Sequence, residues 1–84
     1  MNGCFITFRS VTHAQRGERI LMGEGIRCRI LRTPRWMEEQ GCGYCIRLLR
    51  RDLERAILLL QTNGAPFRKV YRQEEGEGFT EVVL

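Results

Sequence analysis

Short segments in which hydrophobic residues alternate with polar ones predict the strands of this chain. Residues 4–8 (CFITF) are rich in β-formers, residues 26–31 alternate isoleucine and cysteine with arginine, and residues 44–48 continue this alternation. Residues 67–72 form a fourth segment of this kind. The pattern therefore predicts four short strands.

Two segments between them have a helical period instead. Over residues 10–23 the apolar positions share one helical stripe, Ser10 or Thr12 can cap the start, and a Gly-Glu-Gly sequence ends it. Residues 52–61 repeat this pattern and end at Asn63-Gly64. Glycine lowers helix propensity, so Gly17 within the first helix indicates close packing against a sheet.

The resulting order, β-α-β-β-α-β, predicts an α+β protein of the ferredoxin-like kind. In that fold, four antiparallel strands form one sheet and both helices cover one face. We assign this domain to residues 1–72. Residues 73–84 contain four acids and no base and are expected to form a mobile acidic tail, although four apolar residues there could dock or pair with a partner, namely Phe79, Val82, Val83 and Leu84.

This topology brings three segments that are distant in sequence to one edge of the sheet. The first strand ends and the first helix begins over residues 9–13, the second strand ends at residues 32–35, and the third begins at residues 41–44. We expect these segments to converge.

The excess of basic residues indicates that the protein could bind an anionic partner. The 84 residues carry a net charge of +4, but residues 1–72 alone carry +8, and 13 of the 14 cations are arginines. The planar guanidinium of arginine suits phosphates and other oxyanions, whereas simple solvation of these side chains is the alternative.

The longest apolar run, residues 56–60, is far too short to cross a membrane, and no signal-peptide pattern precedes it. We expect a cytoplasmic location.

In a reducing compartment, four cysteines favour thiols, metal ligands or catalytic groups over disulfides. Cys42 and Cys45 form a CxxC motif, which can bind zinc, cycle to a disulfide, or pair a reactive thiol with a resolving one. The remaining candidate ligands, which offer no second close pair, are Cys4, Cys28 and His13. We therefore predict no metal site.

Strand parity separates the four thiols. Cys4 and Cys28 share the parity of core residues, and Cys45 falls on the sheet face opposite the helices. Cys42 lies between two glycines at the mouth of the third strand, which makes it the best candidate for a functional thiol.

The expected convergence gives Cys42 a positive environment. The N-terminus of the first helix carries partial positive charge, and the nearby basic residues are Arg9, Arg32 and Arg35. Such surroundings favour thiolate over thiol and stabilise an anionic sulfur or selenium species. His13, in the first helical turn, could act as a neutral base or hydrogen-bonding group, or serve only in packing.

Several of these motifs together resemble a known family. They are SVTHAQRGERIL at residues 10–21, Thr33-Pro34-Arg35, Cys42-Gly43, and Ile46-Arg47-Leu48 before the second helix. In this order and spacing, over residues 4–72, the chain resembles the small bacterial selenium/sulfur carrier-like proteins.

The resemblance implies a ferredoxin-like fold and a cysteine that carries sulfur or selenium as a persulfide or selenopersulfide. Cys42 would be the acceptor, with sulfur or selenium donor and acceptor proteins as partners and no resident cofactor. The surrounding positions are Thr12, His13, Thr33, Arg35 and Gly43. The chain departs from the family by having Gln40-Gly41 before the cysteine and Cys45 after it, and this second thiol could resolve a persulfide to a disulfide.

Two other functions compete with a carrier. The open sheet face could bind RNA through basic and aromatic residues, namely Phe5, Arg27, Arg29, Arg47, Lys69 and Tyr71. Alternatively, exposed apolar residues could support a protein interaction or a homodimer; they are Trp36, Met37, Leu58 and Leu59. Because paired carboxylates, a nucleophile elbow and a phosphate-binding glycine loop are absent from the sequence, a non-enzymatic carrier is favoured over an enzyme.

Overall fold

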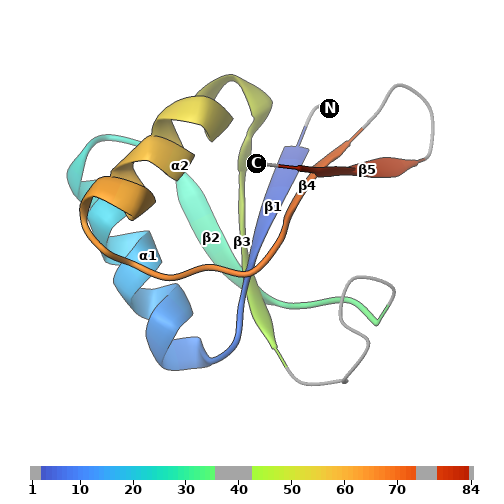
Figure 1. Cartoon of the computed structure of the whole chain (residues 1–84), viewed down its shortest axis with the longest axis horizontal. Helices are drawn as coiled ribbons and strands as arrows, with labels where there is room; N and C mark the ends of the chain where they lie inside the picture. The colour runs from blue at the N-terminus through green and yellow to red at the C-terminus, as the bar shows by residue number, and fades with distance from the viewer. Residues whose placement is uncertain (1–2, 36–42, 74–77, 84) are drawn as a thin grey trace.

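The strands form a single antiparallel sheet in the order β2-β3-β1-β4-β5 (Figure 1). They are β1 (Gly3–Phe8), β2 (Cys28–Arg32), β3 (Tyr44–Leu49), β4 (Val70–Gln73) and β5 (Phe79–Val82). This computed structural model describes residues 3–35, 43–73 and 78–83. The helices are α1 (Val11–Gly23) and α2 (Leu53–Thr62), and the short 3-10 helix η1 (Arg50–Asp52) precedes α2.

The predicted α+β class, with two helices and an antiparallel sheet, is confirmed, but the predicted number of strands is wrong. Residues 79–82, expected in a mobile tail, form β5 and pair with β4. Val82 packs against the hydrophobic core, and the Phe79 ring meets the Phe5 ring edge to face at a centroid distance of 5.4 Å. These contacts explain why an acidic segment joins the sheet.

The helix ends follow their capping residues. Ser10 caps α1 by accepting a hydrogen bond from the His13 backbone N–H, so Ser10 rather than Thr12 is the N-cap. Gly25 and Gly64 have positive φ values of 81° and 64°, and they follow the C-caps of α1 and α2. Glycine adopts this conformation without steric cost, which fixes where each helix stops.

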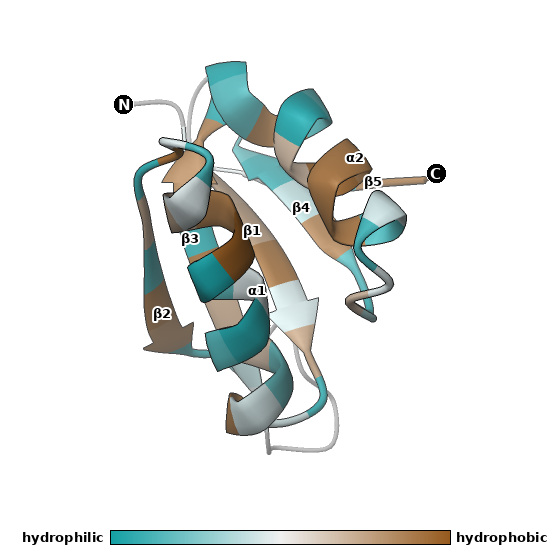
Figure 2. Cartoon of the chain, turned by 90° about the vertical axis from the view of Figure 1, so that its left-hand side faces the viewer, coloured by the Kyte–Doolittle hydropathy of each residue, from teal (hydrophilic) through white to brown (hydrophobic). Residues whose placement is uncertain are grey.

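Both helices lie on the same side of the sheet, in front of it in Figure 2, and enclose the core. The buried core residues of α1 and α2 are Ala14, Leu21, Leu53, Ala56 and Leu60. They face inward-pointing residues of the central strands, including Ile6, Phe8 and Ile46, which have no exposed surface. The close packing predicted at Gly17 is confirmed, because a Cβ there would lie 2.9 Å from Phe8 Cζ.

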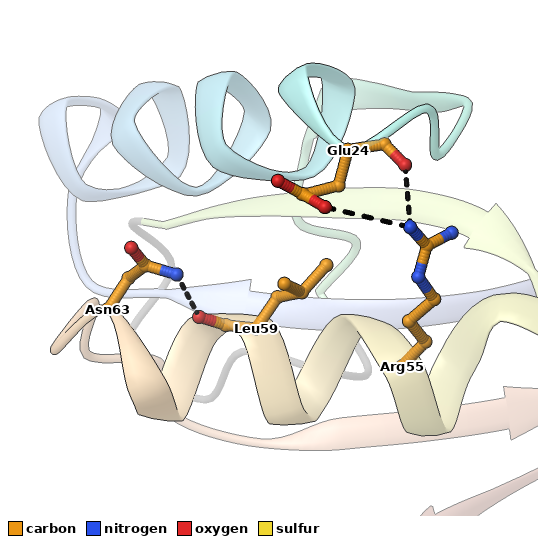
Figure 3. A network of polar contacts seen from close by, with 4 residues as sticks. All are labelled: Glu24, Arg55, Leu59 and Asn63. Atoms are coloured by element: carbon orange, nitrogen blue, oxygen red, sulfur yellow. Dashed lines mark hydrogen bonds and ion pairs between the residues drawn. The ribbon is translucent and has the colours of Figure 1, made fainter.

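The two helices also cap each other through arginines. Arg16 of α1 donates to the carbonyl oxygens of Asn63 and Gly64, at 2.9 and 3.2 Å, just beyond the end of α2. Arg55 of α2 donates to the Glu24 carbonyl at 2.9 Å, beyond the end of α1, and pairs with the Glu24 carboxylate at 3.7 Å (Figure 3). Each helix thereby supplies a cation to the negative end of the other helix's dipole.

Among the residues described, no helix is long and apolar enough to span a membrane. Of the residues considered for a protein interface, Leu58 is 59% exposed, whereas Leu59 packs partly against the core. Trp36 and Met37 lie outside the described residues.

Candidate functional site

The segments predicted to converge meet at one edge of the sheet. Tyr44, the first residue of β3, pairs with Phe8 at the end of β1 and with Arg32 at the end of β2. The Thr33 backbone N–H donates to the Gly43 carbonyl at 3.1 Å, which continues the pairing beyond the strands. Cys42 directly precedes the buried Gly43 and lies outside the described residues. The predicted meeting point is therefore confirmed for its described members.

His13 is oriented by Ser10 at the start of α1. Ser10 Oγ accepts the His13 backbone N–H at 3.2 Å and lies 2.7 Å from His13 Nδ1. When the serine hydroxyl donates to Nδ1, the neutral ring carries its own hydrogen on Nε2. The half-buried imidazole is then held as a hydrogen-bond donor in the first turn of the helix.

Cys45 occupies a buried position on the sheet face opposite the helices. It pairs across the sheet with Thr7 and Leu31, has no exposed surface, and lies outside the main hydrophobic cluster. Burial raises the pKa of the Cys45 thiol, and a hydrogen bond with the Thr33 side chain offsets part of this rise. Its predicted face is confirmed by the register, but its burial gives it little access to a reaction partner.

Thr33 contacts both Cys45 and Gly43 at this edge, and its role in stabilising an anion stays a prediction. Its Oγ1 atom is buried and, apart from Cys45, has no hydrogen-bond partner among the residues the structure describes. Its backbone N–H holds Gly43. Thr33 therefore helps to fix the geometry of this edge through both its side chain and its backbone.

The other two described thiols are also poor nucleophiles. Cys4 is fully buried in the core, and desolvation raises its pKa despite the opposing charges of Arg50 and Arg72. Cys28 packs partly against the core, and burial, aided by the charge of Glu18, raises its pKa to about 11. Their predicted structural roles agree with these surroundings.

The cationic groups of this edge lie on its surface. Arg9 is exposed and, with Pro66, Phe67 and Arg68, lines a surface cavity of about 360 Å³. The guanidinium of Arg32 lies over the Tyr44 ring, 5.9 Å from its centroid, which is a cation–π contact. Thr12 and Arg35 are exposed, in the first turn of α1 and in a turn after β2.

Sequence reasoning missed two residues of this edge. Ser10 was considered only as a helix cap, although the spacing Ser-x-x-His could have indicated its contact with the imidazole. Tyr44 was assigned only to a strand, and its contact with Arg32 depends on a register that periodicity alone does not give. Within the described residues, no group of three or more metal-ligating side chains lies together.

Fold and site together define a small α+β protein in which Cys42 directly precedes Gly43, at the edge where β1, β2 and β3 meet. A protein-family model described as "putative Se/S carrier protein-like" matches residues 3–72. The chain belongs to this family, as its motifs predicted. No curated protein and no solved structure matches the chain significantly.

Proposed function

We propose that this protein carries sulfur or selenium on Cys42, as a persulfide or selenopersulfide. Membership of the carrier-like family supports this role. The observation that carries the assignment to Cys42 is the state of the other thiols: burial raises the pKa of Cys4, Cys28 and Cys45. Because the thiolate is the nucleophile, these three react slowly, and Cys42 remains as the acceptor.

The transfer is an exchange without net oxidation. The Cys42 thiolate attacks the terminal sulfur of a donor protein's persulfide, a new S–S bond forms on Cys42, and the donor's own S–S bond breaks. The donor leaves as a thiolate, and the terminal sulfur is transferred with its proton, which it then releases to solvent to leave an anionic persulfide on Cys42. With a selenopersulfide donor, selenium takes the place of that terminal sulfur. Delivery to an acceptor protein is the same exchange in reverse.

The described residues at this edge suit an anionic cargo on Cys42. Gly43 is held by the Thr33 backbone, and α1 begins directly after β1 at the same edge, so its N-terminal partial positive charge lies there. We assign the His13 imidazole, positioned by Ser10, to hydrogen bonding with the terminal sulfur or selenium. Thr12 and Arg35, both exposed, would supply surface contacts with the cargo or its donor.

Cys45 in this proposal is a slow resolving thiol. Its attack on a Cys42 persulfide would require a buried, protonated sulfur to become exposed and ionised. We therefore expect the persulfide on Cys42 to persist until the protein meets its acceptor. The donor and acceptor are proteins, and we place the exchange in the cytoplasm, where thiols stay reduced.

Persulfide capture tests the proposal. The protein, incubated with a small-molecule persulfide donor and desalted, should gain the mass of one sulfur atom on intact-mass analysis, and peptide mapping should locate it on Cys42. Cys42→Ser should lose this gain, whereas the matched variant Cys28→Ser should retain it. Equal labelling of Cys42→Ser and the wild-type protein would contradict the proposal.

The contribution of His13 is measured separately. His13→Gln should slow sulfur transfer by about tenfold, the loss expected for one hydrogen bond to a charged group, without changing the final stoichiometry. Gln15→Ala serves as the control from the same helix, because its side chain is exposed and has no role in the proposed site. Equal transfer rates in the two variants would remove His13 from the mechanism.

A further inference from the structure

A second candidate binding site lies at the opposite end of the sheet from Gly43 and Thr33. β1 and β2 begin there and β3 ends there, around a surface cavity of about 280 Å³. Its lining includes three arginines and a small apolar floor, namely Arg27, Arg29, Arg47, Gly3, Leu48 and Leu49. None of these residues belongs to the proposed carrier site.

The strand register places two of these cations directly opposite each other. Arg29 of β2 pairs with Arg47 of β3, and Arg27 precedes Arg29 by two residues, which puts it on the same side of the chain. Like charges directly opposite each other in a sheet are unfavourable, so the exposed Arg29 would gain from a bound anion. Within the described part of the chain, neither Arg27 nor Arg29 makes an ion pair or hydrogen bond.

Gly3 brings the third cation to the cavity. A Cβ at Gly3 would lie 3.4 Å from Arg47 Nε and 3.8 Å from Arg47 Nη2, so the guanidinium extends over the glycine backbone. The Gly3 N–H donates to Gln73 Oε1 at 3.3 Å, which anchors the start of β1. Arg47 is thus directed along the sheet toward the cavity that Arg27 and Arg29 also line.

The remaining lining does not compete for an anion. The thiol of Cys28 packs against the core and stays neutral, because burial and the nearby Glu18 charge raise its pKa to about 11. Glu18 belongs to α1, on the helix side of the sheet, and is not part of the lining. Leu49, on the same sheet face as Arg47, lowers the local polarity of the cavity, which strengthens charge-assisted hydrogen bonds.

We propose that this cavity binds a small phosphate-class oxyanion, held by the guanidinium groups of Arg27, Arg29 and Arg47. The planar arginine fork matches phosphate oxygens in a bidentate manner. The cavity suits a small ligand because its volume is at the lower end of the range for small-molecule sites, about 300 to 1,000 Å³. The ligand could be free inorganic phosphate or pyrophosphate, or the terminal phosphate of a small ester.

The aromatic residues of this face favour a small anion over nucleic acid. Binding of single strands generally uses aromatic rings as platforms on which bases stack. Here the Phe5 ring already packs against Phe79 of β5, at a centroid distance of 5.4 Å. The cationic cavity is therefore not accompanied by a free stacking surface at Phe5.

Amide NMR of the full chain, titrated with phosphate, pyrophosphate and a phosphate monoester, tests the proposal. Ionic strength is held constant with chloride so that general screening does not vary. We expect saturable shifts at the backbone amides of Gly3, Cys28 and Arg29. Tighter binding of the monoester than of either inorganic anion would identify an ester as the source, and the reverse order a free anion.

Charge-matched variants make the test specific. Arg29→Ala and Arg47→Ala should each weaken binding by about tenfold or more, the loss of a charge-assisted hydrogen bond. Arg29→Lys should recover only part of this loss because it lacks the fork. Arg19 is an exposed arginine of α1, so Arg19→Ala removes the same charge at a distant position. Its affinity for the anion should stay within about twofold of that of the wild-type protein.

Three results would overturn the proposal: an absence of saturable shifts, equal weakening by Arg19→Ala, or binding of single-stranded RNA where phosphate and its monoester fail. Cys42→Ser should bind phosphate like the wild-type protein. The titration uses no sulfur donor, so the carrier proposal and the oxyanion proposal can fail independently.

Discussion

At the scale of single residues, Gly17 shows how tightly this small core is packed. A Cβ at this position would lie 2.9 Å from Phe8 Cζ, 3.1 Å from Phe8 Cε2 and 3.3 Å from Ile46 Cδ1. Phe8 and Ile46 have no exposed surface, so neither can move without disturbing its neighbours. The glycine is therefore required by the close approach of α1 to the sheet.

Gly17→Ala should destabilise the protein, although alanine improves helix propensity by about 1 kcal/mol. Overpacking of a dense core costs about 1 to 3 kcal/mol, so we expect a net loss of about 1 kcal/mol in the free energy of unfolding measured with urea. Gly23→Ala is the control, because a Cβ at this position, at the helix end, would meet nothing within 4 Å. A stabilised Gly17→Ala variant would contradict the close packing of α1 on the sheet.

The raised pKa of the Cys28 thiol should make the folded protein less stable in alkali. Its pKa is about 11 in the folded protein against an ordinary value of 9.0, so between these values the unfolded chain has released the proton and the folded chain retains it. The unfolded state then binds fewer protons, and the free energy of unfolding falls as the pH rises from about 9 to 11. Equilibrium unfolding across this range should show a shallower fall for Cys28→Ala. An identical pH dependence in the two proteins would show that Cys28 is not the cause.

At the scale of elements, the two helices are joined by a reciprocal arrangement of arginines. Arg16 binds carbonyls beyond the end of α2, and Arg55 binds the carbonyl of Glu24 beyond the end of α1. At the C-terminal end of α2, where Arg16 binds, Asn63 Nδ2 also donates to the Leu59 carbonyl at 2.8 Å (Figure 3). The carbonyls left unpaired at both helix ends are thereby partly satisfied across the helix interface.

Arg16→Ala and Arg55→Ala should each lower the free energy of unfolding by about 0.5 to 1 kcal/mol, because the contacts are exposed hydrogen bonds at helix C-termini. The two sites lie at opposite ends of the helix pair, so their effects should add within about 0.5 kcal/mol in the double variant. Arg19→Ala, on the surface of α1, provides the baseline in the same urea experiment. Losses no larger than that baseline would show that the arginines are merely solvated.

At the scale of the whole molecule, the acidic C-terminal segment completes the sheet. The strand β5 extends the pairing of β4, and Glu81 of β5 lies opposite Tyr71. The four acids of residues 73–84 also lower the net charge from +8 for residues 1–72 to +4 for the chain. The segment thus contributes both a strand and charge compensation.

Truncation after Gln73 tests the domain boundary that the sequence predicts. Residues 1–73 should still fold, with a free energy of unfolding lower by about 1 to 2 kcal/mol, because Phe5 loses the Phe79 ring and β4 loses its neighbour. Amide NMR dispersion reports folding, and urea denaturation reports stability. Phe79→Ala in the full chain separates the ring contact from strand pairing, and Val83→Ala, at an 88% exposed position, should have little effect. An unfolded truncated chain would show that the domain includes the tail.

The sequence alone determined the helices, the first four strands and the edge at which Gly43, the residue after the candidate thiol, lies. Alternation and helical spacing report which face of an element is buried, and glycine and serine mark the ends of helices through local geometry that tertiary contacts do not alter. Cys4, Gly17 and the caps at Ser10, Gly25 and Gly64 were predictable for this reason. The family of the chain was predictable too, since it rests on short motifs in order.

Only the tertiary structure decided the roles that depend on contacts between distant residues. The fifth strand forms because Phe79 and Val82 find partners in β1, β4 and the core, which tail composition does not reveal. Cys45 is inaccessible although its parity places it on the open sheet face, and the arginines of β2 and β3 share a cavity because of their register. The pairing of strands that are far apart in sequence, and the covering of single positions on the open face, depend on long-range packing, which local periodicity alone does not specify.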